Sequence, residues 1–177
     1  MSGFSFSLFG RRKALKMATD RAYAGLMGTA LAPKFYADET IADTFEARAQ
    51  MVTLYAAVAL RRLRMAAKPD ETDPLSEALN ARILDGFDAA YREKGVGDSS
   101  IARKVRKLAE AHYGLGKAVT ESLVAHDLEA VCQVLVRNGV TNEDKVRPFA
   151  GHLLNMLARF ENQPEEQVRL GNFAWDA

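Results

Sequence analysis

Residues 43–67 read DTFEARAQMVTLYAAVALRRLRMAA, and this stretch decides the fold. Its apolar side chains fall on most of the circumference of a helix, and a helix of that kind is buried on nearly all sides. Asp43 and Glu46 have the three-residue spacing of a capping box, which would open the helix. The stretch therefore predicts a central helix, from about residue 43 to residue 67, against which the rest of the chain packs.

The segments before this helix also follow helical spacing. Residues 11–32 contain few helix breakers and are predicted to form a first helix that Pro33 stops. Residues 34–41 interrupt the apolar pattern and are predicted to form a loop. Alternation typical of a strand occurs only within the first nine residues.

After the central helix, capping residues divide the chain into further helices. Asp73, which a proline follows, marks one helix start, and Gly95 supplies a left-handed helix end. Asp98 is expected to cap the next helix. Within that helix, Gly114 and Gly116 are expected to cause a bend or a break.

The last third of the chain continues in the same way. Asp127 restarts the apolar stripe and Gly139 ends that helix. A last long helix should carry Pro148 in its first turns, and one further turn is expected after Pro164. The sequence therefore predicts an all-α fold, a single compact domain of six or seven helices with a short N-terminal arm.

Composition narrows the class of protein. The 177 residues are 48% hydrophobic and 27% charged, with a net charge of +1, which fits one globular domain and excludes a fibrous or disordered chain. A single cysteine, Cys132, excludes an intramolecular disulfide and indicates a reducing compartment. Because Cys132 lies on an apolar stripe, we expect a buried, unreactive thiol. No apolar run reaches the length of about 18 residues that a membrane-spanning helix needs.

Motifs of enzymes are absent from the sequence. It contains no GxGxxG, GxxxxGK[ST], HExxH or GxSxG, so no catalytic residue, metal or cofactor is predicted. His112, His126 and His152 lack the spacing of metal ligands and are expected to be packing or partly exposed residues. Asp85 and Asp88, one helical turn apart, are expected on a solvated face. The alternative for this pair is the magnesium–diphosphate site of a helical isoprenoid-type enzyme.

The distribution of charge is more informative than its sum. Three groups of cations stand out, and each has two interpretations: a solvated face, or a surface that docks phospholipid heads, ribosomal RNA or an acidic protein patch. The groups are Arg11, Arg12, Lys13 and Lys16; Arg61, Arg62 and Arg64; and Arg103, Lys104, Arg106 and Lys107.

The predicted N-terminal arm comprises residues 1–16, and the helical domain residues 17–177. In the arm, cations follow a short apolar segment, which is the reverse of a secretory signal, so we expect the chain to stay in the cytoplasm. Aromatic rings followed by cations suit weak attachment to anionic lipid, with a flexible terminus as the alternative. The candidate membrane contacts are Phe4, Phe6, Phe9, Arg11, Arg12 and Lys13.

Three blocks of sequence point to a known family. The first contains Phe35-Tyr36, Asp43-Thr44, Arg48, Met51 and the LRRL of residues 60–63. The second is REKGVGD, residues 92–98, which continues to Lys104, Lys107 and Tyr113-Gly114, and the third is Leu135 with Arg137-Asn138. Over about residues 20–140, the chain thus resembles the ubiquinol–cytochrome c chaperone family, the assembly factors of respiratory complex III.

The resemblance implies a non-enzymatic chaperone that assists the synthesis or assembly of cytochrome b, without a cofactor. It also implies contact with nascent or newly inserted cytochrome b, with the ribosome, and with the cytoplasmic face of the inner membrane, as in a bacterial member. A small partner subunit is left open. The alternatives are the isoprenoid-type enzyme and a membrane-surface or RNA-binding adaptor without client specificity.

The candidate client or partner contacts combine aromatic residues of these blocks with the cationic groups. Ordinary core packing is the alternative for the aromatic residues, since buried rings stabilise small domains strongly. The candidates are Phe35, Tyr36, Arg61, Arg62, Arg103, Lys104, Lys107 and Tyr113.

Overall fold

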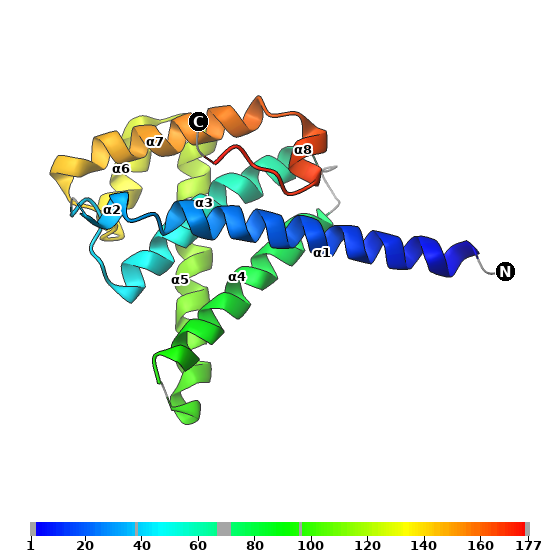
Figure 1. Ribbon diagram of the computed structural model, residues 1–177. Coiled ribbons are helices and arrows are strands. Elements are labelled where there is room, and N and C mark those ends of the chain that lie inside the picture. The colour runs from blue at the N-terminus through cyan, green and yellow to red at the C-terminus, as the bar shows by residue number, and fades with distance from the viewer. Residues whose placement is uncertain (1–2, 38, 67–71, 96, 176–177) are drawn as a thin grey trace.

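The computed structural model describes residues 3–37, 39–66, 72–95 and 97–175, and within them the chain forms helices and turns without a strand (Figure 1). Six helices have ten residues or more, which confirms the predicted all-α domain of six or seven helices. The helices are α1 (Gly3–Ala30), α2 (Lys34–Ala37), α3 (Phe45–Met65), α4 (Pro74–Glu93), α5 (Asp98–Val124), α6 (Leu128–Arg137), α7 (Glu143–Glu161) and α8 (Glu165–Arg169).

Helix α3 is the central element, as the sequence predicts. Every residue from 51 to 59 is buried, and α3 packs against α1, α4, α5 and α7. The predicted capping box is wrong by one residue: Thr44 is the N-cap, and its side chain accepts a hydrogen bond from the Ala47 N–H at 3.1 Å. Asp43 instead pairs with Arg48 at 2.7 Å, so its carboxylate is not available as the cap.

Helix α1 begins eight residues earlier than predicted, at Gly3 rather than residue 11, and continues without a break through residue 16. The fully buried stripe of α1 contains Ala18, Ala22, Leu26 and Ala30, at four-residue spacing, and half-buried Leu15 also packs against the core, so packing against the domain begins near residue 15. The N-terminal end of α1 accordingly extends beyond the other helices (Figure 1). The predicted arm is therefore a projecting stretch of helix.

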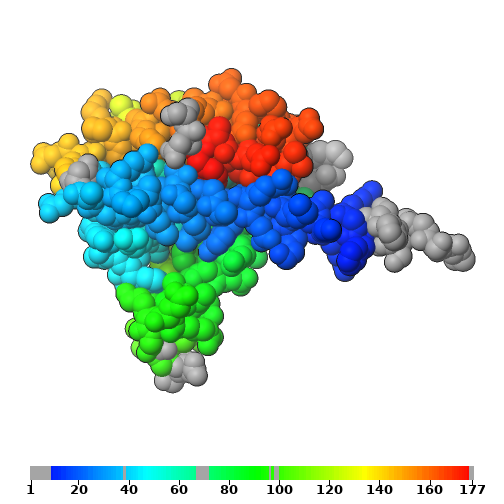
Figure 2. Space-filling view, viewed as in Figure 1, coloured from blue at the N-terminus to red at the C-terminus, as the bar shows by residue number. Residues whose placement is uncertain are grey.

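Helices α4 and α5 form a hairpin whose connected ends lie away from α6, α7 and α8 (Figures 1 and 2). Asp73 caps α4 as predicted, and Gly95 adopts a positive φ of 71° after its end. The prediction that Asp98 caps α5 is wrong, because the N-cap position is Gly97. Of the bend or break predicted at Gly114 and Gly116, the break does not occur: α5 runs from Asp98 to Val124, and packing on α3 outweighs the weak helix propensity of glycine.

The C-terminal helices match their predicted caps. Asp127 caps α6, Gly139 follows it with a φ of 63°, and α7 contains Pro148. The single turn predicted after Pro164 is α8. The predicted loop at 34–41 contains one short helix, α2. In the described part of the chain, no helix is both long and apolar enough to cross a bilayer.

Candidate functional site

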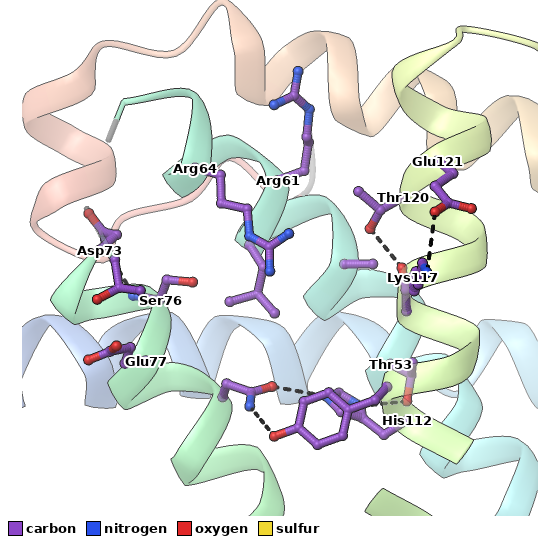
Figure 3. Close-up of a pocket in the computed structure, with 16 residues that line it drawn as sticks. Thr53, Arg61, Arg64, Asp73, Ser76, Glu77, His112, Lys117, Thr120 and Glu121 are labelled. Atoms are coloured by element: carbon purple, nitrogen blue, oxygen red, sulfur yellow. Dashed lines mark hydrogen bonds and ion pairs between the residues drawn. The ribbon is translucent and has the colours of Figure 1, made fainter. Parts of the chain in front are cut away.

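An open cleft of about 910 Å³ lies between α3, α4 and α5 (Figure 3). Helix α3 contributes one stripe of side chains, and α4 and α5 form the two walls. Charged and hydroxyl-bearing side chains dominate the lining. The lining residues are Thr53, Ala57, Leu60, Arg61, Arg64, Thr72, Asp73, Ser76, Glu77, Asn80, His112, Tyr113, Gly116, Lys117, Thr120 and Glu121.

A chain of hydrogen bonds joins the three helices at the floor of this cleft. His112 of α5 lies with Nδ1 2.8 Å from Oγ1 of Thr53 in α3 and with Nε2 3.1 Å from Oδ1 of Asn80 in α4. The Nδ2 amide of Asn80 then donates to the hydroxyl of Tyr113 at 2.9 Å. Since Oδ1 of Asn80 only accepts, the arrangement favours the neutral tautomer in which Nε2 of His112 donates. The network fixes the floor and leaves Tyr113 54% exposed above it.

Burial controls the charge of His112. The residue is 5% exposed, and desolvation lowers its pKa from 6.5 to about 4. A histidine of the unfolded chain binds a proton below about pH 6.5. Between these two pKa values the unfolded state therefore binds a proton that the folded state does not, and folding stability falls as the pH falls.

We expect the free energy of unfolding to be about 3 kcal/mol lower at pH 4 than at pH 7 because of His112 alone, from 1.36 kcal/mol per pKa unit. Urea denaturation at both pH values, compared between the natural protein and His112→Gln, isolates this contribution. The variant should lose less stability over the same interval. Equal losses in the two proteins would contradict the assignment.

The cationic side chains of the cleft differ in how well they are paired. Arg61 and Arg64 make no hydrogen bond or ion pair with any described residue, and Nε of Arg61 is buried without an acceptor. Lys117 lies 4.0 Å from Glu121, at the limit of an ion pair. In contrast, Asp73 pairs with Arg169 and accepts from the Ser76 N–H. The α3 side of the cleft thus carries two arginines that form no ion pair with any described residue, and the acids Glu77 and Glu121 lie on the other two walls.

Only two of the predicted contact residues, Arg61 and Tyr113, meet in the cleft. Arg62, the neighbour of Arg61, is 7% exposed and donates to the carbonyl oxygens of Phe160 at 2.7 Å and Gln163 at 2.9 Å. Its guanidinium is therefore committed to holding α3 against the end of α7.

Two of the three predicted aromatic contacts, Phe35 and Tyr36, pack in or against the core. The ring of Phe35 packs edge-on against Tyr55 and Phe149, with centroids 6.0 and 6.1 Å apart. Tyr36 is 8% exposed, and its hydroxyl donates to the Ala30 carbonyl at 3.1 Å. Burial raises the pKa of the Tyr36 hydroxyl, so it stays protonated as this donor. Core packing therefore accounts for both residues, and neither presents its ring as a contact surface.

The other predicted contacts form two exposed surfaces outside the cleft. Arg103, Lys104 and Lys107 are exposed on the first half of α5, in the α4–α5 hairpin. In the arm, Phe9 is 75% exposed, and the cations Arg11, Arg12 and Lys13 are exposed as well. The side chains of Phe4 and Phe6 lie outside the described residues.

The acidic pair and the remaining histidines occupy separate places. Asp85 is exposed on α4, and Asp88 pairs with Arg92 at 2.7 Å. His152 lies 2.8 Å from the Tyr55 hydroxyl, and His126 is exposed. Among the described residues, no group of three or more histidine, cysteine or acidic side chains is placed to hold a metal ion. Cys132 is buried as predicted, and burial raises the pKa of its thiol.

The sequence did not point to Asn80 or Lys117 as candidate site residues. Arg64 was expected only as one cation of a basic group, and His112 only as a packing or partly exposed residue. A signal for Arg64 was present, because Ala57, Leu60, Arg61 and Arg64 follow the spacing of one helix face. The residues of α4 and α5 gave no such signal, since their meeting depends on how the helices pack.

The fold resembles that of a solved structure, and most of the sequence matches a known family. A crystal structure described as that of the Cbp3 homolog from Brucella abortus shares the fold, with a TM-score of 0.82 and 24% sequence identity, over 98% of this chain and 97% of that chain. No curated protein matches the sequence. The family described as ubiquinol-cytochrome C chaperone matches residues 37–175, which is most of the chain and contains the whole cleft. The chain therefore belongs to the ubiquinol–cytochrome c chaperone family.

Proposed function

We propose that this protein is a non-enzymatic chaperone that assists cytochrome b during assembly of ubiquinol–cytochrome c reductase, respiratory complex III. Membership of the chaperone family is the observation that carries the proposal. The sequence blocks that resemble the family imply cytochrome b, the haem-carrying membrane subunit, as the client.

The cleft between α3, α4 and α5 offers a surface on which a chaperone can bind its client. A chaperone has to hold a segment of its client and then release it, so it needs a binding surface with many moderate contacts. An open cleft with a half-exposed tyrosine and two arginines that pair with no described residue provides these side chains on a frame of three helices. Arginine and tyrosine are also the side chains that contribute most often to binding energy at protein interfaces.

Deleting the gene tests the proposal. We expect the absorbance of haem b and the amount of assembled complex III to fall severalfold, and expression of the full chain to restore both. The messenger RNA for cytochrome b should remain unchanged, because the defect lies in assembly. Normal levels of cytochrome b and complex III in the deletion strain would reject the function.

We extend the proposal to the location of the protein, a peripheral position on the cytoplasmic face of the inner membrane. The exposed Phe9 and the cations that follow it in the projecting end of α1 support this location, because basic residues contribute about 1 kcal/mol each near anionic lipid. Complementing the same deletion strain with residues 17–177 tests the arm. We expect less of this shorter protein in the membrane fraction, and an unchanged distribution would reject the extension.

The exposed cations of the α4–α5 hairpin, Arg103, Lys104 and Lys107, belong to the same proposal as a docking surface for an anionic assembly, either the ribosome or the lipid headgroups. In the complemented strain, their replacement by glutamine should lower association with one of the two fractions. The fraction that loses the protein identifies the surface it docks on.

A further inference from the structure

Helix α1 carries a stripe of exposed side chains that runs from the projecting arm into the domain. Phe9, Lys13, Met17 and Arg21 follow one another at four-residue spacing, and all four are exposed. Four residues turn a helix by about 400°, so successive members of the stripe lie only about 40° apart around the helix. Phe9 is 75% exposed and Met17 51%. The stripe therefore alternates apolar and cationic side chains over about 18 Å of helix.

This stripe lies on the outer face of α1, away from the core. Ala18 and Ala22 follow Met17 and Arg21 by one position each, which turns them by about 100° toward the core that buries them. In Figure 2, the blue part of α1 runs uncovered across the viewed face of the molecule, from the domain to the arm. The outer face, defined by the four exposed residues of the stripe, is therefore accessible to a partner along its whole length.

The charges around the stripe are nearly all positive. The sequence has no acidic residue before Asp20, and Asp20 pairs with Lys16 at 2.7 Å. Arg11, Arg12 and Lys13 are exposed on the same stretch of helix. The partner that complements this surface is therefore anionic.

The alternation within the stripe decides between anionic partners. An RNA helix presents its phosphates outward, so it would meet the cations but leave the Phe9 ring and the Met17 thioether in water. At the surface of an anionic bilayer, long lysine and arginine side chains bend so that their charged ends stay at the headgroups. Apolar side chains of the same helix face enter the boundary with the acyl chains, where their burial adds to the electrostatic attraction. A bilayer therefore accommodates both kinds of side chain.

We propose that the outer face of α1 lies along the surface of an anionic bilayer, with Phe9 and Met17 inserted and Lys13 and Arg21 at the headgroups. The inference rests on the proposed membrane location and deepens it. That location needs only the arm, residues 1–16, whereas the outer face also includes Met17 and Arg21 of the helical domain. Contact along the outer face sets α1 parallel to the bilayer and holds the domain against the membrane in one orientation.

Cosedimentation of the full chain with vesicles made only of lipid tests the inference. We expect binding to vesicles of phosphatidylglycerol and phosphatidylcholine in equal parts, and weaker binding as salt is raised, because salt screens the cations. Met17→Ser should weaken binding about fivefold through loss of the inserted side chain. Lys13→Gln/Arg21→Gln should weaken it about thirtyfold, because it removes two charges from the headgroup region.

Matched variants outside α1 serve as controls. Met65→Ser makes the same change at an exposed methionine of α3, and Lys117→Gln/Arg137→Gln removes two exposed cations. Both should leave binding within twofold. Phe9→Ser should weaken binding whether the arm alone or the whole outer face meets the lipid, so it shows that the assay detects the arm. Circular dichroism of each variant checks that the helices are intact.

Three results would overturn the inference. In the first, Phe9→Ser weakens binding but neither Met17→Ser nor Lys13→Gln/Arg21→Gln does, which would leave the arm alone as the membrane contact. In the second, vesicles of phosphatidylcholine alone bind equally well. In the third, the full chain binds no lipid vesicle, and an acidic protein at the membrane would then be the partner of the cations.

The gene-deletion experiment reports on the chaperone function independently. If the deletion strain loses cytochrome b and one of these three results is found, the function stands and the assignment of the outer face fails.

Discussion

Replacing Asp73 by alanine is expected to lower the free energy of unfolding by about 3 kcal/mol, the larger part from a lost ion pair and the rest from a lost helix cap. The side chain of Asp73 is 2% exposed, and its two oxygens serve different partners. One oxygen accepts from the Ser76 N–H at 2.9 Å, and the other from Nη1 of Arg169. Urea denaturation of the natural protein and the variant measures the loss.

The ion pair matters because Arg169 connects three elements. Its Nη2 donates to the carbonyl of Ala66 at 3.1 Å, so one guanidinium joins the end of α3, the start of α4 and the helix α8. Removing one partner of a buried pair typically costs about 3–5 kcal/mol. We expect a value below this range for the pair itself, about 2 kcal/mol, since the Arg169 side chain is 36% exposed and water can partly replace the carboxylate.

Asp127→Ala is the matched control. Asp127 is also an N-cap aspartate, and it accepts from the N–H groups of Glu129 and Ala130, but it is exposed and has no ion pair among the described residues. Its replacement should cost only the cap, about 1 kcal/mol. Similar losses in the two variants would show that the pair between Asp73 and Arg169 contributes nothing.

The sequence predicts the helices well because each is encoded locally, by its own caps and apolar stripe. Its errors occur where two local signals compete. The phenylalanines near the N-terminus alternate as in a strand, yet α1 includes them, since residues 3–10 contain no proline and a single interior glycine is tolerated in a helix. Gly114 and Gly116 read as a break, yet α5 continues through both, because its packing on α3 outweighs the weak helix propensity of glycine.

The cleft could be predicted only in part. Arg61 and Arg62 are adjacent in sequence and looked equivalent, but neighbours on a helix point about 100° apart. Arg62 follows the fully buried Val58 by four residues and Tyr55 by seven, which directs it to the core, and this could have been read from the apolar pattern. That Asn80 and His112 meet across the floor could not, because residues 32 positions apart are brought together only by the packing of α4 on α5.

Replacing Gly171 by alanine is expected to cost about 4 kcal/mol, among the largest effects of any single substitution in this chain. Gly171 has a φ of 77°, a conformation that disfavours every residue with a Cβ atom. A Cβ there would also lie 2.0 Å from the carbonyl oxygen of Ala18, a backbone atom that cannot turn aside. Because the buried stripe of α1 begins at Ala18, the added methyl group should displace α1 from the C-terminal segment.

Gly139→Ala separates the two causes. Gly139 has a similar φ of 63°, but a Cβ there would meet no atom within 4 Å, so its replacement should cost only the conformational strain, about 1–2 kcal/mol. Chemical denaturation gives both losses, and hydrogen exchange in α1 reports where the structure opens. We expect faster exchange from residue 18 to residue 30 in the Gly171 variant alone. Equal losses in the two variants would mean that α1 is not held where its backbone meets the C-terminal segment. The projecting arm would then lack a fixed base for the membrane contact that we propose.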